Sequence, residues 1–150
     1  MAKKVKVDLG SNSYNITMIG DFKDSVKRFA SSTKSQCILI TQKNIFDLYK
    51  KQFDELSNIS NINIFLIDEG EKAKSFDSTI SIVNEMADKR FDRSSLVLAI
   101  GGGVVGDLAG FAASIYMRGI KYVQYPTTLL AMVDSSIGGK TGINLEDGKN

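Results

Sequence analysis

The sequence predicts an α/β fold in which helices flank a mostly parallel sheet. Short β-rich runs alternate with helical patterns along all 150 residues, which is the order typical of a layered α/β domain. The run Ser95–Ile100 is continuously apolar, as expected of a parallel strand covered on both faces. A hydrophobic content of 43% supports one core, and no repeat or low-complexity linker divides the chain. We therefore expect residues 1–150 to form one domain.

The first third of the chain should contain a strand pair, a helix and a further strand. Val5–Leu9 and Asn15–Ile19 are β-rich runs separated by polar turn residues, so they are expected to pair. Asp21 is a suitable N-cap for a helix that continues through Phe29. The apolar run Gln36–Thr41 then predicts the first strand of the main sheet.

The middle third should alternate two helices with a strand. A stripe of apolar residues predicts one helix over Asn44–Leu56, and Ile62–Ile67 is a further strand. Ser75 or Asp77 would open a helix that runs to about residue 89. The core side of that helix is expected to hold Phe76, Ile80, Val83 and Ala87.

The last third follows the same alternation. After the strand Ser95–Ile100, unusually small side chains predict a closely packed helix over Val105–Ser114. Lys121–Tyr125 is a strand, and residues 127 to about 134 a helix. The chain from Lys140 onward looks like an extended arm with an Asp-Gly turn signal. This order of elements favours a Rossmann-like sheet.

Charge and composition exclude several classes of partner. The 19 basic and 17 acidic residues nearly balance, which argues against binding to nucleic acid or to an anionic membrane. The single cysteine, Cys37, lies in an apolar run and cannot form a disulfide within the chain, which fits a reducing cytosol. No apolar stretch approaches the length of a membrane span, and the N-terminus has no apolar leader. We therefore expect a soluble, cytoplasmic protein.

A glycine cluster is the first candidate for chemistry. Gly101, Gly103 and Gly106 satisfy the spacing G-x-G-x-x-G directly after a strand and at the start of a helix. Such a turn presents backbone N–H groups and a helix N-terminus to a pyrophosphate. The motif falls on a late strand and lacks an acidic residue about twenty positions further on, so it departs from the ordinary dinucleotide fingerprint. A glycine-rich helix start without a ligand is the alternative.

Three further clusters follow predicted strands or helices. The segment Asp68–Lys74 comes after a strand, where open α/β sheets hold ligands, although an ordinary charged loop would look the same. Thr127 would serve as an N-cap, and Arg118 lies at a helix end, where a cation is favourable. The segment Asp134–Lys140 brackets a glycine turn with an acid and a base. Clusters at successive strand ends favour convergence on one crevice.

Together these motifs resemble the 3-dehydroquinate synthase family. The resemblance rests on the strings G-G-G-V-V-G-D-L-A-G-F-A-A-S, Y-M-R-G-I and Y-P-T-T-L-L-A-M-V-D-S-S-I-G-G-K-T-G-I-N, with earlier support from Gly70, Glu71 and Lys74 and from Ser13-Tyr14. It implies that residues 1–150 are the NAD-binding α/β domain of such an enzyme. The helical C-terminal domain of the family, with a glutamate and two histidines that bind metal, is absent from this sequence, which has no histidine.

The resemblance also implies an activity. Members of the family are carbon–oxygen lyases that convert 3-deoxy-D-arabino-heptulosonate 7-phosphate to 3-dehydroquinate and phosphate, in the shikimate pathway of aromatic amino acid biosynthesis. NAD is used and regenerated within one turnover, and zinc or cobalt acts as a Lewis acid. The chain by itself is therefore expected to be inactive and to contain no metal ligand, and the enzyme is expected to be a homodimer.

The resemblance implies roles for individual residues. Those expected to contact NAD are Asn44, Glu69, Gly70, Glu71, Lys72, Ala73, Lys74, Gly103, Val104, Val105, Gly106, Asp107, Thr127, Thr128, Lys140 and Lys149. Those expected to face the reacting substrate are Asp134, Lys140 and Asn150. Arg118 is expected to reach the substrate phosphate across a dimer interface. Gln42 stands where the family usually has an acid that holds the adenosine ribose, which implies modestly weaker NAD binding.

Two alternatives stay open at this point. Another sugar phosphate cyclase, of the deoxyinosose or valiolone synthase type, would share this scaffold and act on a different sugar phosphate. A non-catalytic nucleotide-binding module is the better interpretation if 150 residues are the complete natural product.

Overall fold

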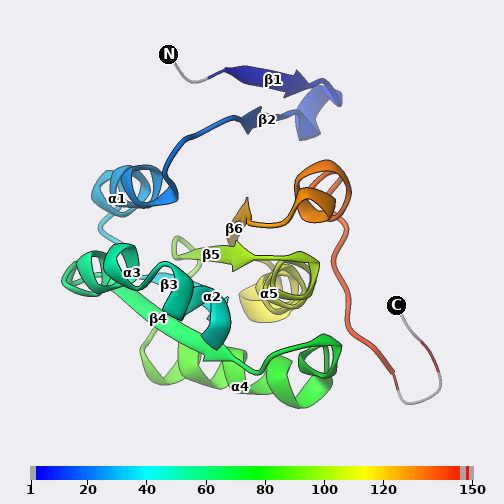
Figure 1. The fold of residues 1–150 in the computed structure, drawn as a ribbon. Helices are drawn as coiled ribbons and strands as arrows, with labels where there is room; N and C mark the ends of the chain where they lie inside the picture. The colour runs from blue at the N-terminus through cyan, green and yellow to red at the C-terminus, as the bar shows by residue number, and fades with distance from the viewer. Residues whose placement is uncertain (1–2, 146–147, 149–150) are drawn as a thin grey trace.

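The computed structural model describes residues 3–145 and 148. Its strands are β1 (Lys4–Val7), β2 (Tyr14–Thr17), β3 (Cys37–Gln42), β4 (Ile62–Ile67), β5 (Leu96–Gly101) and β6 (Lys121–Pro126). The last four form a parallel sheet in the order β4-β3-β5-β6, whereas β1 and β2 form a separate antiparallel pair that lies to one side (Figure 1). The predicted α/β fold with a parallel sheet is therefore confirmed.

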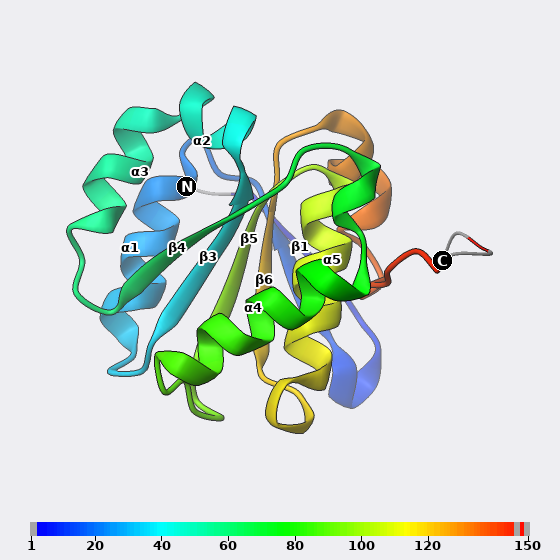
Figure 2. The same cartoon turned by 90° about the horizontal axis from the view of Figure 1, so that it is seen from below.

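Helices cover both faces of the main sheet. Their bounds are α1 (Phe22–Ser32), α2 (Lys43–Leu48), α3 (Lys50–Ser57), α4 (Phe76–Asp88) and α5 (Gly103–Ile115), with short turns η1 (Gly10–Asn12), η2 (Glu71–Ala73), η3 (Tyr116–Arg118) and the π-helical η4 (Ala131–Ser135). Figure 2 shows the three layers, with α1 and α3 on one side of the sheet and α4 and α5 on the other. Among the described residues, no helix combines the length and the apolar character needed to cross a membrane.

Two hydrophobic cores lie back to back across β3 and β5, whose residues are all buried. Leu39, Leu98 and Ile100 face α1 and α3, where they pack with Val26 and Phe53. On the other face, Ile38, Ile40, Val97 and Ala99 pack with α4 and α5. Alternate residues of each strand thus serve opposite cores, which explains the continuous apolar run in β5.

The helix predicted over Asn44–Leu56 is in fact two helices, and this prediction was wrong. The break lies at Tyr49, whose φ of −111° and ψ of 29° are not helical. The Tyr49 ring meets Phe22 edge-on with centroids 5.4 Å apart, while Phe46 stacks on Phe53 at 5.1 Å. The bend therefore brings rings from both helices into one aromatic cluster on α1, a preference that depends on residues far away in the sequence.

The buried face predicted for α4 was also wrong. Phe76, Ile80 and Ala87 are exposed, and the core instead receives Thr79, Ile82 and Met86, with Val83 packed at its margin. The helix carries two apolar stripes, and Thr79 lies on the buried one. Its hydroxyl can be buried because it donates to the Ser75 carbonyl at 2.9 Å. Of the two predicted caps, Ser75 is the one used: its Oγ accepts from the Ser78 N–H at 3.2 Å.

Smaller differences concern the element ends. The Asp21 cap is confirmed, since its Oδ1 accepts from the Lys23 N–H at 2.8 Å. Helix α5 begins at Gly103, two residues before the predicted start. After β6, Thr128 rather than Thr127 acts as the cap, because the Ala131 N–H donates to Thr128 Oγ1 at 3.2 Å.

Candidate functional site

The carboxyl ends of the four parallel strands meet at one edge of the sheet, and the connections diverge between β3 and β5. Open α/β sheets bind ligands at such a point, so this edge is the expected ligand crevice. The chain leaves β3 toward β4 on one side and leaves β5 toward β6 on the other, so the two loops separate. The backbone pairing of β3 with β5 is described only as far as Ile40 and Ala99. Beyond it, the Thr41 hydroxyl donates to the Ile100 carbonyl at 2.7 Å, which holds the strands together directly below the crevice.

The glycine-rich start of α5 forms one wall. No described side chain caps this helix, so its first N–H groups are available at a positive helix end. A Cβ on Gly103 would lie 3.3 Å from Ser135 Oγ, tighter than usual contact, so glycine allows η4 to approach the helix start. The Thr127 N–H donates to the Gly101 carbonyl at 2.9 Å and fixes the chain after β6 against the same turn.

Two hydroxyl groups border this helix start without a protein partner. Thr127 Oγ1 and Ser135 Oγ are buried, and neither forms a hydrogen bond within the described part of the chain. A buried hydroxyl without a partner is costly, so its presence indicates a ligand or water that satisfies it. Thr127 was among the predicted cofactor contacts, whereas Ser135 was missed. Its place inside the D-S-S-I-G-G-K string was the signal that could have found it.

The loop after β4 is tied to α5 by a buried ion pair. Lys74 Nζ lies 2.8 Å from Asp107 Oδ2, with side chains only 7% and 16% exposed. Glu71 Oε1 lies 3.5 Å from the same ammonium group. Both Lys74 and Asp107 were predicted NAD contacts, and the structure brings them together from segments 33 residues apart. The ion pair therefore fixes the loop after β4 against α5.

The arm that follows η4 packs against both α5 and the loop after β4. Thr141 packs on α5 at Gly110, where a Cβ would come within 2.3 Å of its methyl carbon. The Asn144 N–H donates to the Lys74 carbonyl at 2.8 Å, and Asn144 Nδ2 donates to Glu71 Oε1 at 3.0 Å. Asn144 was not predicted. Its role depends on the arm returning to the loop after β4, which no local pattern indicates.

Asp134 and Lys140, predicted to act on the substrate, form an ion pair. Both side chains are more than half exposed, so water and a substrate can reach them. Asp134 directly precedes Ser135, whose hydroxyl lies close to Gly103 at the start of α5. Lys140 is a compact positive charge of the kind that binds phosphate oxygens.

Tyr122 supports α5 from below. Its hydroxyl donates to the Gly106 carbonyl at 2.5 Å. Burial, and secondarily the Asp107 carboxylate, raises the pKa of Tyr122 well above its usual value, so the hydroxyl stays protonated and remains a donor. Gly106, itself a predicted contact, is therefore held through its carbonyl by β6.

The remaining predicted NAD contacts divide by exposure. Val105, Gly106 and Ala73 are buried. Glu69, Gly70, Lys72 and Asn44 are exposed on the loops after β4 and β3, Thr128 is exposed after β6, and Val104 is half-buried. Gln42 differs from expectation: its amide is buried and donates to the Asp68 carbonyl at 3.0 Å, which links the ends of β3 and β4.

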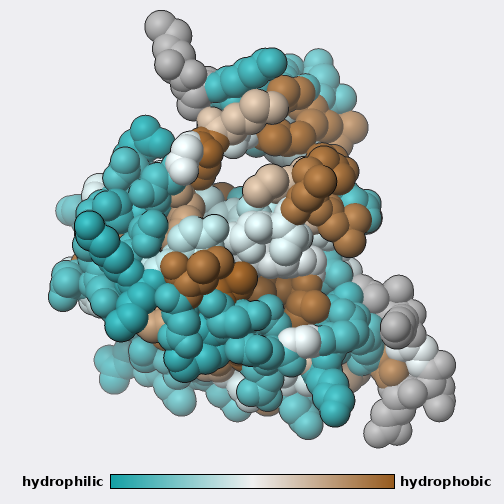
Figure 3. All heavy atoms as spheres, viewed as in Figure 1, coloured by the Kyte–Doolittle hydropathy of each residue, from teal (hydrophilic) through white to brown (hydrophobic). Residues whose placement is uncertain are grey.

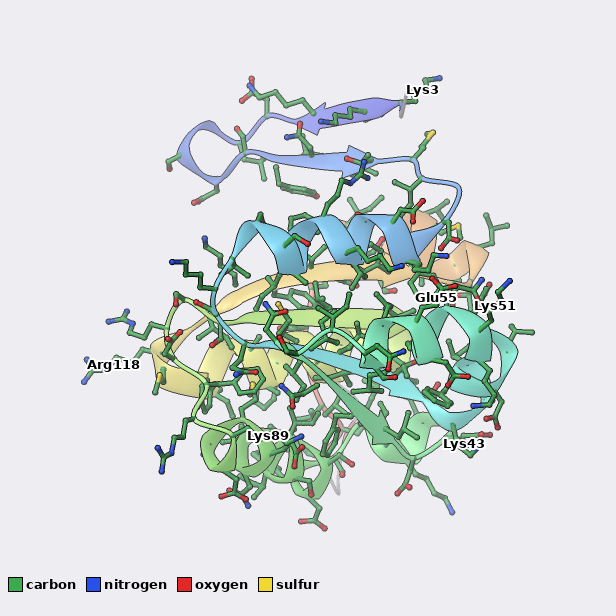
Figure 4. All side chains as sticks on the ribbon, turned by 90° about the vertical axis from the view of Figure 1, so that its left-hand side faces the viewer. Lys3, Lys43, Lys51, Glu55, Lys89 and Arg118 are labelled. Carbon is green, nitrogen blue, oxygen red and sulfur yellow. The ribbon has the colours of Figure 1, made fainter. Side chains whose placement is uncertain are left out.

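Arg118 is the predicted site residue that the structure does not bring to the crevice. It lies in the turn before β6, at the amino end of the strands, whereas Lys43 follows the carboxyl end of β3. Figure 4 shows these two labelled side chains at opposite ends of the sheet. A six-residue strand spans roughly 20 Å, so Arg118 cannot reach this chain's own crevice. Lys149 and Asn150 lie outside the described residues.

The crevice suits a dinucleotide better than a metal ion. Uncapped helix N–H groups, close-packed glycines and two orphaned hydroxyls offer donors to a pyrophosphate and to ribose. The chain has no histidine, and the described residues contain no group of three His, Cys, Asp or Glu side chains that could hold a metal. A metal therefore does not fit these residues.

Comparison with known sequences gives consistent matches. The family described as 3-dehydroquinate synthase N-terminal matches residues 64–150. The 3-dehydroquinate synthase of Dictyoglomus thermophilum is 48% identical over 99% of this chain and 41% of its own length. That of Ruminiclostridium cellulolyticum is 43% identical over 96% of this chain and 41% of its own length. The chain thus spans about two fifths of the curated relatives it matches.

Solved structures show the same fold. A 2-deoxy-scyllo-inosose synthase complexed with carbaglucose-6-phosphate, NAD+ and Co2+ superimposes with a TM-score of 0.85 at 24% identity, over 99% of this chain and 41% of that chain. A 2-epi-5-epi-valiolone synthase from Streptomyces hygroscopicus subsp. jinggangensis, with NAD+ and Zn2+ bound, is 37% identical with a TM-score of 0.66, over 73% of this chain and 31% of that chain.

Proposed function

The chain belongs to the 3-dehydroquinate synthase family, and from that premise we propose that it is the NAD-binding part of a 3-dehydroquinate synthase. The proposed reaction is the conversion of 3-deoxy-D-arabino-heptulosonate 7-phosphate to 3-dehydroquinate and phosphate. Its setting would be the cytoplasm and the shikimate pathway, which a free buried thiol at Cys37 is compatible with.

One observation carries the proposal: the uncapped start of α5 is bordered by two buried hydroxyls that have no protein partner. A pyrophosphate at this position would accept hydrogen bonds from the helix N–H groups, and Thr127 Oγ1 and Ser135 Oγ would gain partners. The NAD+ in the valiolone synthase structure, whose sequence is 37% identical, supports the choice of nucleotide.

We propose distinct roles for the residues around the bound nucleotide. NAD would supply a hydride acceptor. The loop after β4 would hold ribose hydroxyls through Glu71, while Lys74 remains paired with Asp107 and keeps the loop against α5. Lys140 would bind an anionic oxygen of the substrate, and Asp134 would orient the Lys140 ammonium group. Lys149 and Asn150 are assigned by the resemblance alone.

Arg118 would act in a second subunit. Its position at the amino end of the strands rules out a contact with its own crevice, whereas its exposed turn can enter the crevice of another copy. The proposed active unit is therefore a homodimer in which each Arg118 guanidinium binds the substrate phosphate of its partner.

The metal would come from residues outside this chain. A helical domain, as in the family, would supply a glutamate and two histidines, and would also cover an apolar surface beside the crevice. Leu129, Leu130, Met132 and Val133 are all exposed there, and Figure 3 shows apolar side chains gathered over this segment. Four neighbouring exposed apolar residues are unusual on a free surface, which supports a covering domain.

The test is phosphate release from 3-deoxy-D-arabino-heptulosonate 7-phosphate by the full-length enzyme that carries this chain, supplied with NAD and zinc. Lys140→Ala should abolish turnover while the protein remains folded by circular dichroism. The isolated 150-residue chain should release little or no phosphate. Near-normal turnover by Lys140→Ala, or a normal rate from the isolated chain, would contradict the proposal.

Another sugar phosphate cyclase activity is the second candidate, because the valiolone synthase is 37% identical to this chain. Assays with a panel of other sugar phosphates beside the heptulosonate phosphate separate these activities, since each cyclase should release phosphate from one substrate. A module that binds NAD with turnover of none of them would indicate a non-catalytic role.

A further inference from the structure

Tyr14 lies far from the glycine clusters in sequence, yet it contacts the turn that carries Lys140. The Gly138 N–H donates to the Tyr14 hydroxyl at 2.8 Å, across 124 positions of sequence. Within residues 3–145, this is the one hydrogen bond that joins the β1–β2 pair to the remainder of the chain. Figure 1 shows the pair lying apart from the main sheet, next to the segment that follows β6.

The turn that receives this bond depends on its backbone conformation. Gly138 and Gly139 both have positive φ, at 86° and 68°. A Cβ at either position would meet nothing within 4 Å, so the need for glycine is conformational rather than steric. These two residues reverse the chain after η4 and return Lys140 to Asp134, with which it pairs. Two adjacent glycines can adopt many conformations, so Lys140 keeps a fixed position only if a contact from outside the turn restrains them.

The β1–β2 pair is built to present Tyr14 rigidly. Ser13 closes the turn between the strands: its Oγ accepts from the Leu9 N–H at 2.9 Å and donates to Asp8 Oδ1 at 2.9 Å. Tyr14 follows directly and pairs with Val7 in the ladder. Its backbone is thus held by pairing with β1, and its half-buried side chain accepts the bond from Gly138.

We propose that Tyr14 is a positioning residue, whose hydroxyl fixes the Gly138-Gly139 turn and thereby places Lys140 beside Asp134 for the reaction. This inference rests on the proposed function, because it takes Lys140 as the group that binds substrate. Tyr14 itself touches no reacting atom. Its contribution should appear in the rate of the chemical step and in the order of the turn.

The experiment compares Tyr14→Phe with wild type in the full-length enzyme, using whichever cyclase substrate the wild type turns over. Removal of the hydroxyl should lower kcat about tenfold, the effect of one lost hydrogen bond on alignment, while KM for NAD changes less than about twofold. Hydrogen exchange measured by mass spectrometry should be at least about fivefold faster in the peptide covering residues 136–141, with an unchanged melting temperature.

Tyr125→Phe is the matched control. It also removes a hydroxyl that links two elements, Tyr125 to Ser25 at 3.1 Å, but it lies on the α1 side of the sheet. It should leave kcat and exchange over residues 136–141 unchanged. A second variant, Gly138→Ala, disturbs the same turn through its positive φ and should lower kcat similarly, with no further loss when combined with Tyr14→Phe.

The outcomes separate this inference from the proposed function. Wild-type kcat and wild-type exchange in Tyr14→Phe would overturn the positioning role even if Lys140→Ala is inactive. Equal losses in Tyr14→Phe and Tyr125→Phe would overturn it as well, since both would then report general destabilisation. Near-normal turnover by Lys140→Ala would instead overturn the proposed function, and faster exchange in Tyr14→Phe would still support the hold on the turn.

Discussion

The two faces of the main sheet are packed in opposite ways. On the side of α1 and α3, large rings fill the core: Phe22 lies 5.5 Å from Phe53 and 5.4 Å from Tyr49, between ring centroids. On the other side, the buried residues of α5 are mostly glycine and alanine. Large rings fill space and exclude neighbours, whereas small residues let side chains from other segments lie against the helix backbone.

We infer that the aromatic face contributes mainly to stability and the α5 face mainly to the candidate site. The aromatic face supplies a dense core, and apart from Asn44 on α2 the predicted ligand contacts lie on the loops and on α5. The small residues of α5 fill less core volume, and they allow Ser135, Thr141 and the Lys74 loop to approach the helix closely. Substitutions on the two faces should therefore differ in what they damage, and four predictions test this.

The largest loss of stability is expected on the aromatic face. Phe53→Ala removes a fully buried ring and should lower the free energy of unfolding by about 3–5 kcal/mol in urea titrations. The folded fraction should bind NAD with unchanged affinity. Phe29→Ala, whose ring is 40% exposed, is the control and should cost less than about 1 kcal/mol. Equal losses in both variants would contradict a core centred on Phe53.

The next largest effect is expected at the buried ion pair. Lys74→Met leaves the Asp107 carboxylate unpaired and 16% exposed, which should cost about 3 kcal/mol in the same titrations. The double variant Lys74→Met/Asp107→Leu should recover most of that loss. Lys50→Met, which removes an exposed pair with Asp54, should change stability by at most about 0.5 kcal/mol. A mild effect of Lys74→Met would show that the pair is not desolvated.

A smaller change in stability, with a larger local effect, is expected at Gly110. Gly110→Ala gains helix propensity worth about 1 kcal/mol, but its Cβ would overlap the Thr141 methyl carbon at 2.3 Å and press on the Tyr122 ring at 3.0 Å, so the arm must move and the ring must shift slightly. The free energy of unfolding should change by less than about 1 kcal/mol, while hydrogen exchange over residues 140–145 accelerates and NAD binding weakens. Gly20→Ala, where a Cβ meets nothing within 4 Å, should alter neither. An unchanged arm in Gly110→Ala would refute the close contact.

The smallest effect is expected from pH at Cys37. Burial raises the pKa of this thiol from 9.0 to about 11 in the folded chain. Between these values the unfolded thiol ionises while the folded one stays protonated, so its contribution to stability is present below pH 9 and is lost as pH rises toward 11. Cys37→Ala should show a shallower loss of stability over this range. Rapid labelling of native Cys37 by a thiol reagent at pH 8 would contradict the burial.

Most of the candidate site could be predicted because its residues follow strands. The glycine cluster, the Asp68–Lys74 loop and the Asp134–Lys140 segment each come after an element that the sequence identifies, and parallel strands bring their carboxyl ends together. Asn144 and Tyr14 could not be assigned in this way. Each acquires its role from a neighbour distant in sequence, such as Glu71 for Asn144 or Gly138 for Tyr14.

The sequence by itself determined the order of the strands of the main sheet, the cap at Asp21 and the small-residue character of α5, and it left Ser75 and Asp77 open as the cap of α4. These depend on the periodicity of side chains and on local hydrogen bonds, which adjacent residues control. Only the tertiary structure decided which stripe of α4 is buried, where the helix breaks at Tyr49, and that Arg118 points away from its own crevice. Those outcomes depend on competition among contacts between distant segments, and a linear pattern holds no information about which contact has the lower free energy.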